Sequence, residues 1–282
     1  MNLPNATLVL PRRPPMQTAQ ATQTLEYAWI EPEGMDKGAS PLVFLHEGLG
    51  SIALWRRFPA DLCAQLGRRG LVYSRFGYGR STPRPRDEPL PPDYLEREAN
   101  ETLPALLAAL LVENSENSAK PWLVGHSDGG SIALIAAAQE LSTQLAGIVV
   151  IAPHYFVEEV CLTGIERARR AYEEGDLRPR LARHHQEVDS VFHGWHDVWM
   201  DPARRGWNLR HLLPQIACPL LAIQGREDEY ATLEQIEGIR RHLPHAELRV
   251  IEACGHFPHL TRADETIAAI AAFIRESEGK NR

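Results

Sequence analysis

Short apolar segments alternate with longer amphipathic segments along most of this 282-residue chain. The apolar segments are rich in Leu, Val and Ile and show little polar alternation, which is typical of strands buried on both faces of a parallel sheet. Six such segments occur: Pro41–His46, Leu71–Arg75, Pro121–His126, Gly147–Ala152, Pro219–Gln224 and Glu247–Glu252. This alternation predicts an α/β fold with a mostly parallel central sheet and helices on both of its faces.

The segments between these strands have the pattern of helices. We expect them at Ile52–Leu66, Asp93–Leu111, Gly129–Glu140, Thr232–Leu243 and Asp264–Glu276. Leu8–Leu10 and Thr24–Ile30 favour an antiparallel hairpin at one edge of the sheet, and the proline-rich Pro83–Pro92 favours a loop.

One long segment interrupts the alternation. Some 65 residues between Ala152 and Pro219 contain no convincing strand, and a structureless loop of that length is uncommon. We therefore expect a helical insertion over about 154–214, lying as a lid over the C-terminal edge of the sheet, where α/β ligand sites form. The expected organisation is a single domain, 1–282, with its core at about 20–153 and 215–277.

Composition excludes several classes of protein. The net charge is −7 and 44% of the residues are hydrophobic, which argues against disorder and leaves no basic excess for nucleic acid or an anionic membrane. The N-terminal stretch MNLPNATLVLPRRPP lacks the pattern of a secretory signal. Four widely spaced cysteines form no CxxC pair, which predicts buried free thiols. These features predict a cytoplasmic protein without membrane or nucleic-acid partners.

The strongest chemical motif is the segment Gly125–Gly130, which follows a predicted strand and precedes a predicted helix. It contains G-x-S-x-G with Ser127 at its centre. In this context the motif is typical of a nucleophile elbow, in which a serine sits on a tight turn at the N-terminus of a helix. We predict that Ser127 is a catalytic nucleophile.

A nucleophilic serine needs a base and an acid that orients the base, and after an elbow they follow in the order acid, histidine. Asp228 follows a predicted strand by a short glycine turn and is the expected acid, with Glu227 and Glu229 as alternatives. His256, on a glycine-flanked loop after the last strand, is the expected base, and His259 is the alternative.

An oxyanion hole needs two backbone N–H groups. One is expected from Asp128, the residue after the nucleophile, and the other from the loop after the first core strand. Gly48 is the expected donor in that loop, with Leu49 as the alternative.

The sequence resembles the α/β-hydrolase superfamily, in the lid-bearing branch of esterases, thioesterases, lactonases and carbon–carbon bond hydrolases. Four motifs carry the resemblance in the family's order: the His46 loop, the segment Arg75–Ser81, the Ser127 elbow and the pair formed by Asp228 and His256. The similarity runs from about Thr24 to Ile274 and implies the α/β-hydrolase fold. One position departs from the family pattern, because Glu47 follows the loop histidine where the family has glycine.

These residues predict a serine hydrolase that cleaves a small carboxylic ester, thioester or lactone without a metal or organic cofactor. A carbon–carbon bond hydrolase of an aromatic degradation pathway, with the same triad, and a non-catalytic small-molecule receptor remain alternatives. The expected partner is a small acyl substrate. Five residues are candidates for its pocket: Glu47, Leu49, Trp195, Trp199 and Phe257. The tryptophans either line an apolar pocket or pack the lid onto the core.

Two further patterns are weaker. Gly48–Ala53 matches the dinucleotide fingerprint G-x-G-x-x-A, and Arg75 would then suit the 2′-phosphate of NADP. His193 and His196 have metal-ligand spacing, but no third ligand follows at a defined distance. The dinucleotide interpretation leaves Ser127, Asp228 and His256 unexplained, and the two lid histidines are better explained by a polar helix surface.

Overall fold

The computed structural model describes residues 5–11, 22–111 and 119–280, so residues 20–21 and 112–118 of the predicted core lie outside them. These residues contain one eight-stranded sheet with the order β1-β2-β4-β3-β5-β6-β7-β8. The strands are β1 (Ala6–Pro11), β2 (Thr22–Ile30), β3 (Leu42–Leu45), β4 (Gly70–Tyr73), β5 (Trp122–His126), β6 (Gly147–Ile151), β7 (Leu220–Gly225) and β8 (Glu247–Ile251).

The sheet is parallel from β4 to β8, and β1 and β2 add an antiparallel edge. Strands β3 to β7 are buried along their whole length, as their continuous apolar sequences predict. The chain passes from β3 to β4 on one side and later returns to β5 on the other side. The order therefore reverses between β3 and β5, and α/β proteins bind ligands at such a point.

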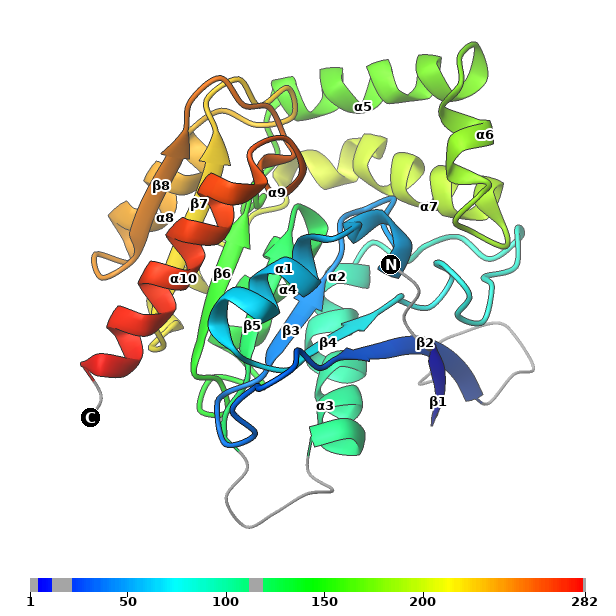
Figure 1. The fold of residues 1–282 in the computed structure, drawn as a ribbon. Coiled ribbons are helices and arrows are strands. Elements are labelled where there is room, and N and C mark those ends of the chain that lie inside the picture. Colours follow the sequence, from blue (N-terminus) through cyan, green and yellow to red (C-terminus); the bar gives the residue numbers. More distant parts are fainter. Residues whose placement is uncertain (1–4, 12–21, 112–118, 281–282) are drawn as a thin grey trace.

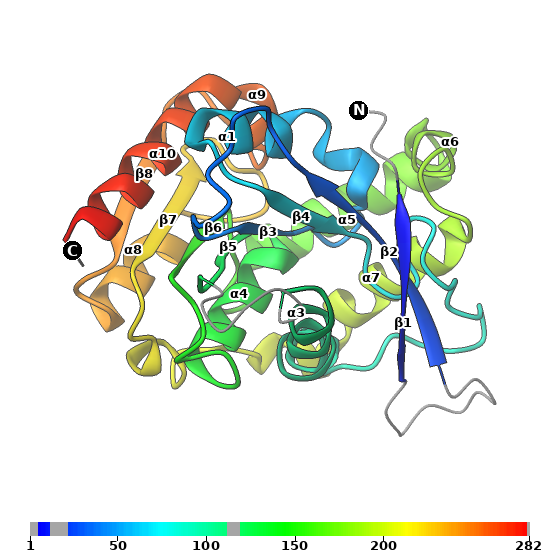
Figure 2. The ribbon, with the colours of Figure 1, turned by 60° about the horizontal axis from the view of Figure 1, so that its bottom comes forward.

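Helices cover both faces of the sheet (Figure 2), as the sequence predicts. On one face, α1 and α10 pack on a cluster that includes Phe44, Val124 and Ile223, while α3, α4 and α8 cover the other face. The core helices are α1 (Phe58–Leu66), α2 (Tyr94–Arg97), α3 (Leu103–Leu111), α4 (Asp128–Ala138), α8 (Glu234–His242), α9 (Pro258–Thr261) and α10 (Ala263–Gly279).

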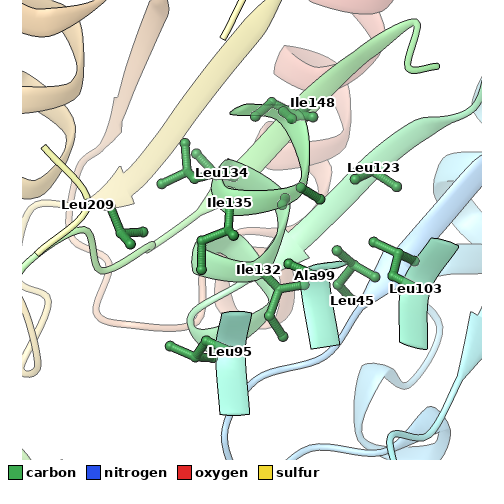
Figure 3. Close-up of a cluster of buried hydrophobic side chains, with 14 of the residues drawn as sticks. Leu45, Leu95, Ala99, Leu103, Leu123, Ile132, Leu134, Ile135, Ile148 and Leu209 are labelled. Atoms are coloured by element: carbon green, nitrogen blue, oxygen red, sulfur yellow. The ribbon is translucent and has the colours of Figure 1, made fainter. Parts of the chain in front are cut away.

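Helix α4 lies inside the core and has no solvent-facing side, because every one of its residues is buried. Figure 3 shows Ile132, Leu134 and Ile135 of this helix among side chains from β3, β5, β6 and the α2–α3 segment. A helix packed on all sides is rigid, and its N-terminal end is therefore a well-fixed platform for the residue that precedes it.

Two predicted helices are divided in the structure. The prediction of a single helix over Ile52–Leu66 is wrong. A 3₁₀ turn, η1 (Ile52–Trp55), is followed by Arg56, whose φ of 54° is left-handed, and α1 starts anew at Phe58. The predicted helix Asp93–Leu111 contains a π-helical segment, η2 (Glu98–Thr102), between α2 and α3. Pro104 lies two positions after the end of this segment, and since proline has no N–H to donate, the regular hydrogen-bond ladder is interrupted here.

The segment between β6 and β7 is helical, as predicted. It contains α5 (Glu159–Glu173), α6 (Leu177–Leu181), α7 (Val188–Met200) and two 3₁₀ turns, η4 (Pro202–Gly206) and η5 (Leu213–Gln215). Figure 1 shows α5, α6 and α7 together at one end of the molecule, beyond the ends of the sheet strands.

Two observations concern general properties of the chain. In the described segments, each helix is too short or too polar to cross a lipid bilayer. All four cysteines are free thiols and are buried.

Candidate active site

Ser127 stands at the sharp turn between β5 and α4. Its backbone has φ 52° and ψ −117°, a conformation that non-glycine residues rarely adopt. The turn is tight because two glycines let the backbones approach closely. A Cβ on Gly125 would lie 2.1 Å from the carbonyl oxygen of Gly129, and a Cβ on Gly129 would lie 1.9 Å from the carbonyl oxygen of Leu45. The motif thus needs glycine at both positions.

We expect Gly129→Ala to be strongly destabilising. Its Cβ would meet backbone atoms of β3, which no rotamer change can move, so the cost is expected at about 3 kcal/mol or more. The midpoint and slope of chemical unfolding measure it. Gly279→Ala in α10 is the matched control, since nothing lies within 4 Å of its Cβ position. A Gly129 variant as stable as the control would contradict the predicted close approach.

The structure brings Ser127, His256 and Asp228 into one hydrogen-bonded chain. Nε2 of His256 lies 3.0 Å from Oγ of Ser127. Nδ1 of His256 lies 2.9 Å and 3.0 Å from the two carboxylate oxygens of Asp228. The three residues come from the ends of β5, β7 and β8, which are separated in sequence and meet at one edge of the sheet.

The electrostatics of this pair favour a charged carboxylate beside the imidazole. Burial alone would lower the pKa of His256, but the charge and hydrogen bonds of Asp228 raise it above the ordinary value. Burial alone would raise the pKa of Asp228, but His256 and the backbone N–H of Tyr230 hold it below the ordinary value. The arrangement therefore stabilises an imidazolium between Asp228 and Ser127.

The alternative acids and base occupy other positions. Glu227 is exposed to solvent. Glu229 accepts a hydrogen bond from the backbone N–H of His256 at 3.0 Å, so it supports the loop rather than the ring. His259 packs its ring 5.1 Å from Trp55, and burial lowers its pKa to about 3.

Among the loop N–H groups, hydrogen bonding separates Gly48 from Leu49. The backbone N–H of Leu49 donates to the Glu47 carboxylate. Within the described residues, the N–H groups of Gly48 and Asp128 have no acceptor. This leaves the expected pair of donors, Gly48 and Asp128, available to a ligand.

The side chain of Asp128 is held away from solvent by two partners. The hydroxyl of Tyr94 donates to its carboxylate at 2.7 Å, and the Arg75 guanidinium lies 3.6 Å from the same oxygen. Arg75 also donates to the carbonyl oxygen of Glu47 at 2.8 Å. Arg75 thus joins the loop after β3 to the turn after β5. The sequence did not predict this link, although Arg75 belongs to the family motif Arg75–Ser81.

Glu47, the departure from the family pattern, turns its carboxylate back onto its own loop. Burial, opposed by the hydrogen bond from Leu49, raises its pKa to about 7. Arg75 contacts the carbonyl of Glu47 and not its carboxylate. The side chain therefore changes charge close to neutral pH while it stabilises the loop that carries Gly48.

A cavity of about 610 Å³ opens in front of Ser127 and His256. Helices α5, α6 and α7 supply part of its wall, and Trp195 of α7 packs directly against Gly48. All five predicted pocket residues line it: Glu47, Leu49, Trp195, Trp199 and Phe257. His154 and Tyr230, which the sequence did not single out, also line it and flank the His256 ring, with centroids 6.0 Å and 4.8 Å away.

Residues 42–269 match the sequence model of the Alpha/beta hydrolase family, which is most of the chain. The chain belongs to the alpha/beta hydrolase family. The predicted fold class is thereby confirmed.

Among curated relatives of this alpha/beta hydrolase, Serine hydrolase BPHL of Homo sapiens is 31% identical over 197 residues, which is 67% of this chain. The match spans 63% of the human protein, less than two thirds of its length. Proline iminopeptidase of Mycobacterium smegmatis superposes with a TM-score of 0.71 at 19% identity, covering 92% of this chain and 97% of that one. A thermophilic esterase from Thermogutta terrifontis superposes with a TM-score of 0.67 at 21% identity, covering 93% of this chain and 97% of that one. At these identities the two structures show a shared fold.

The weaker sequence patterns have structural explanations in this alpha/beta hydrolase. Arg75, considered for a 2′-phosphate, is buried and contacts Asp128 and the Glu47 carbonyl. The His193 ring packs against Tyr172, and Nδ1 of His196 lies 2.8 Å from its neighbour Asp197.

Proposed function

We propose that this alpha/beta hydrolase is a serine hydrolase that cleaves a small carboxylic ester, or a thioester or lactone, through Ser127, His256 and Asp228. The observation that carries the proposal is the unbroken hydrogen-bond chain from the Ser127 hydroxyl through His256 to Asp228. Nucleophile, base and orienting acid in this geometry are the requirement for acyl transfer to serine.

In the proposed reaction, Nε2 of His256 takes the proton of Ser127 while Oγ attacks the acyl carbonyl carbon. Asp228 stabilises the imidazolium that forms. The carbonyl oxygen becomes an oxyanion, and the N–H groups of Gly48 and Asp128 donate to it, each worth about 3–4 kcal/mol. His256 then gives its proton to the leaving group, which is the oxygen of an alcohol or the sulfur of a thiol. A water deprotonated by His256 hydrolyses the acyl-enzyme and restores Ser127.

The proposed organisation is a single domain in which residues 154–214 form a lid. This is supported by the position of α5, α6 and α7, which contribute cavity wall to the same pocket as Ser127 and His256. Substrate selection would then depend on the lid side chains, with Trp195 and Trp199 offering apolar surface to an acyl or alcohol group.

The test is intact mass after treatment with a fluorophosphonate, which reacts with activated serines. We expect one adduct on the wild type and none on Ser127→Ala. Ser51→Ala is the matched control, because Ser51 lines the same cavity and must not affect labelling. If the wild type is not labelled, Ser127 is not an activated nucleophile, and the non-catalytic receptor alternative is favoured. Turnover confined to vinylogous diketones would favour carbon–carbon hydrolysis.

We expect kcat/KM for ester hydrolysis to fall as the pH is lowered through the pKa of His256. Only the neutral imidazole accepts the Ser127 proton, and Asp228 raises this pKa above 6.5. The acid limb of the profile should therefore lie above pH 6.5, as measured with a neutral ester whose own ionisation does not change. An acid limb well below that pH would contradict the assignment of His256 as base.

We expect Glu47→Gln to increase kcat/KM at pH 8 by about two- to fivefold. The carboxylate, with a pKa of about 7, is charged at pH 8, and one charge several ångströms from an oxyanion opposes it by about this much. Glutamine retains the acceptor for the Leu49 N–H. The acid limb should also move to lower pH, since Glu47 helps to raise the pKa of His256. A rate at pH 8 well below that of the wild type would instead indicate that the charge is required.

A further inference from the structure

A second cavity of about 570 Å³ adjoins the pocket in front of Ser127. The two cavities share Ser51 and Arg56 in their walls, so they are neighbours in space. The second cavity lies between the insertion and the core, because its wall includes Arg183 from the connection between α6 and α7 together with Arg80 from the loop after β4. We name it the side cavity. The proposed reaction makes no use of it.

Three arginines from three separate segments line the side cavity, and all three are exposed to solvent: Arg56, Arg80 and Arg183. In the part of the chain that the structure describes, none of the three has an ion-pair partner. By contrast Arg57, the next residue after Arg56, pairs with Asp61 at 3.2 Å. Unpaired positive charges around a concavity create a potential that attracts anions.

The local charges are close enough to influence one another. Burial lowers the pKa of His184, which also lines the side cavity, and the charges of Arg183 and Arg56 lower it further. His185, another wall residue, has its pKa lowered to about 4, mainly by burial, so it adds no charge at neutral pH. The positive potential therefore comes from the arginines.

Among the described residues of this wall, one carries a carboxylate, and that carboxylate already accepts hydrogen bonds. Glu26 accepts hydrogen bonds from the hydroxyl of Ser74 and from the backbone N–H of Arg80, each at 2.9 Å, and a further one from the Asn5 amide. Among these described wall residues, the three arginines therefore outnumber the one carboxylate by two charges.

Arg56 has an unusual backbone. Its φ of 54° and ψ of −127° lie outside the regions that side-chain-bearing residues prefer. Strain of this kind is frequent where a side chain is held for a ligand. The conformation places Arg56 at the boundary that both cavities share.

We propose that the side cavity binds a phosphate group carried by the substrate, distant from the acyl bond that Ser127 attacks. Guanidinium groups match phosphate oxygens with paired hydrogen bonds, and an excess of two positive charges suits a dianion better than a single carboxylate. The proposal rests on the proposed function, because it names the class of substrate that the same enzyme hydrolyses: a phosphorylated ester or thioester.

The first experiment measures anion binding without catalysis. Calorimetric titration with inorganic pyrophosphate is expected to show binding to the wild type at low salt. The double variant Arg80→Gln/Arg183→Gln should bind about tenfold more weakly or not at all. Arg57→Gln is the matched control and should bind like the wild type. Equal affinity in all three proteins, or no binding to the wild type, would overturn the anion site.

The second experiment asks whether the anion belongs to the substrate. Two matched pairs place a phosphate or phosphonate group on one side or the other of the scissile bond. Acetyl-CoA, paired with S-acetyl-N-acetylcysteamine, carries phosphate in its thiol part, and methyl 6-phosphonohexanoate, paired with methyl hexanoate, carries phosphonate in its acyl part. In at least one pair the wild type should prefer the charged member by about tenfold in kcat/KM, mainly through KM, and the double variant should lose that preference. Arg57→Gln should keep it.

Other results of the second experiment count against the proposal. No preference in either pair, or a change in kcat on methyl hexanoate when pyrophosphate is added, would assign the side cavity to a free anion instead of the substrate. Fluorophosphonate labelling of Ser127 separates the two proposals. If labelling fails while pyrophosphate binding is lost in the double variant, the proposed hydrolysis is wrong and the anion site stands.

Discussion

Replacing Ser127 by alanine is expected to lower kcat/KM for ester hydrolysis by about 10⁴-fold or more. The lost Oγ is the atom that lies 3.0 Å from Nε2 of His256, and the variant has no other hydroxyl at that point of the elbow. Alanine is smaller than serine and meets the same backbone strain at φ 52°, so the fold should be unchanged. Initial rates at matched protein concentration give the ratio.

Two controls make this result specific. The unfolding midpoint of Ser127→Ala should equal that of the wild type, which separates a lost nucleophile from a lost fold. Ser131→Ala should retain most activity, because the Ser131 hydroxyl donates to the carbonyl of His154 and does not contact His256. Loss of a nucleophile leaves far less than one tenth of the activity. If Ser127→Ala kept more than about one tenth of the wild-type rate, catalysis would not depend on this serine.

The elbow and the sheet were predictable because their signals are local. Continuous apolar residues identify Trp122–His126 as a buried strand, and Gly125 and Gly129 can be recognised without knowing what they touch. The order of strand, serine, acid and histidine then places the triad at one sheet edge. Local sequence therefore carried the fold class and the position of the proposed nucleophile.

Other features depend on contacts that sequence distance hides. Arg75 and Asp128 are 53 positions apart and meet only because β4 and β5 both flank β3. The break after Trp55 was missed because hydrophobic periodicity continues through Arg56 while its backbone turns left-handed. The side cavity likewise requires the α6–α7 connection to lie against the core.

The choice among Glu227, Asp228 and Glu229 shows the same limit at short range. All three are acidic and consecutive, so composition cannot rank them. The structure separates them by direction: Glu227 is exposed, Glu229 accepts from the backbone of His256, and Asp228 faces the ring nitrogen. This assignment makes a demanding prediction: substitutions of the neighbouring residues Asp228 and Glu229 should differ by orders of magnitude in their effect on kcat.

We expect Asp228→Asn to lower kcat by about 10⁴-fold. Asparagine replaces one of the two oxygens that face Nδ1 of His256 by an amide nitrogen, which donates and cannot accept, and it removes the negative charge that favours a proton on Nδ1. The ring then carries its proton on Nε2, where it can no longer take the proton of Ser127. Loss of the carboxylate also removes the interaction that raises the pKa of His256, so any residual activity should have its acid limb at lower pH.

Glu229→Gln is the control for this prediction, because glutamine keeps an acceptor for the backbone N–H of His256. It should lower kcat by less than about tenfold, the range of one neutral hydrogen bond. Steady-state kinetics across pH 5–9 on a neutral ester measure both variants. A Glu229 variant as impaired as Asp228→Asn, or an Asp228 variant close to the wild type, would assign the acid to the wrong carboxylate. The expected difference of about three orders of magnitude follows from which carboxylate contacts the imidazole and which contacts only the chain.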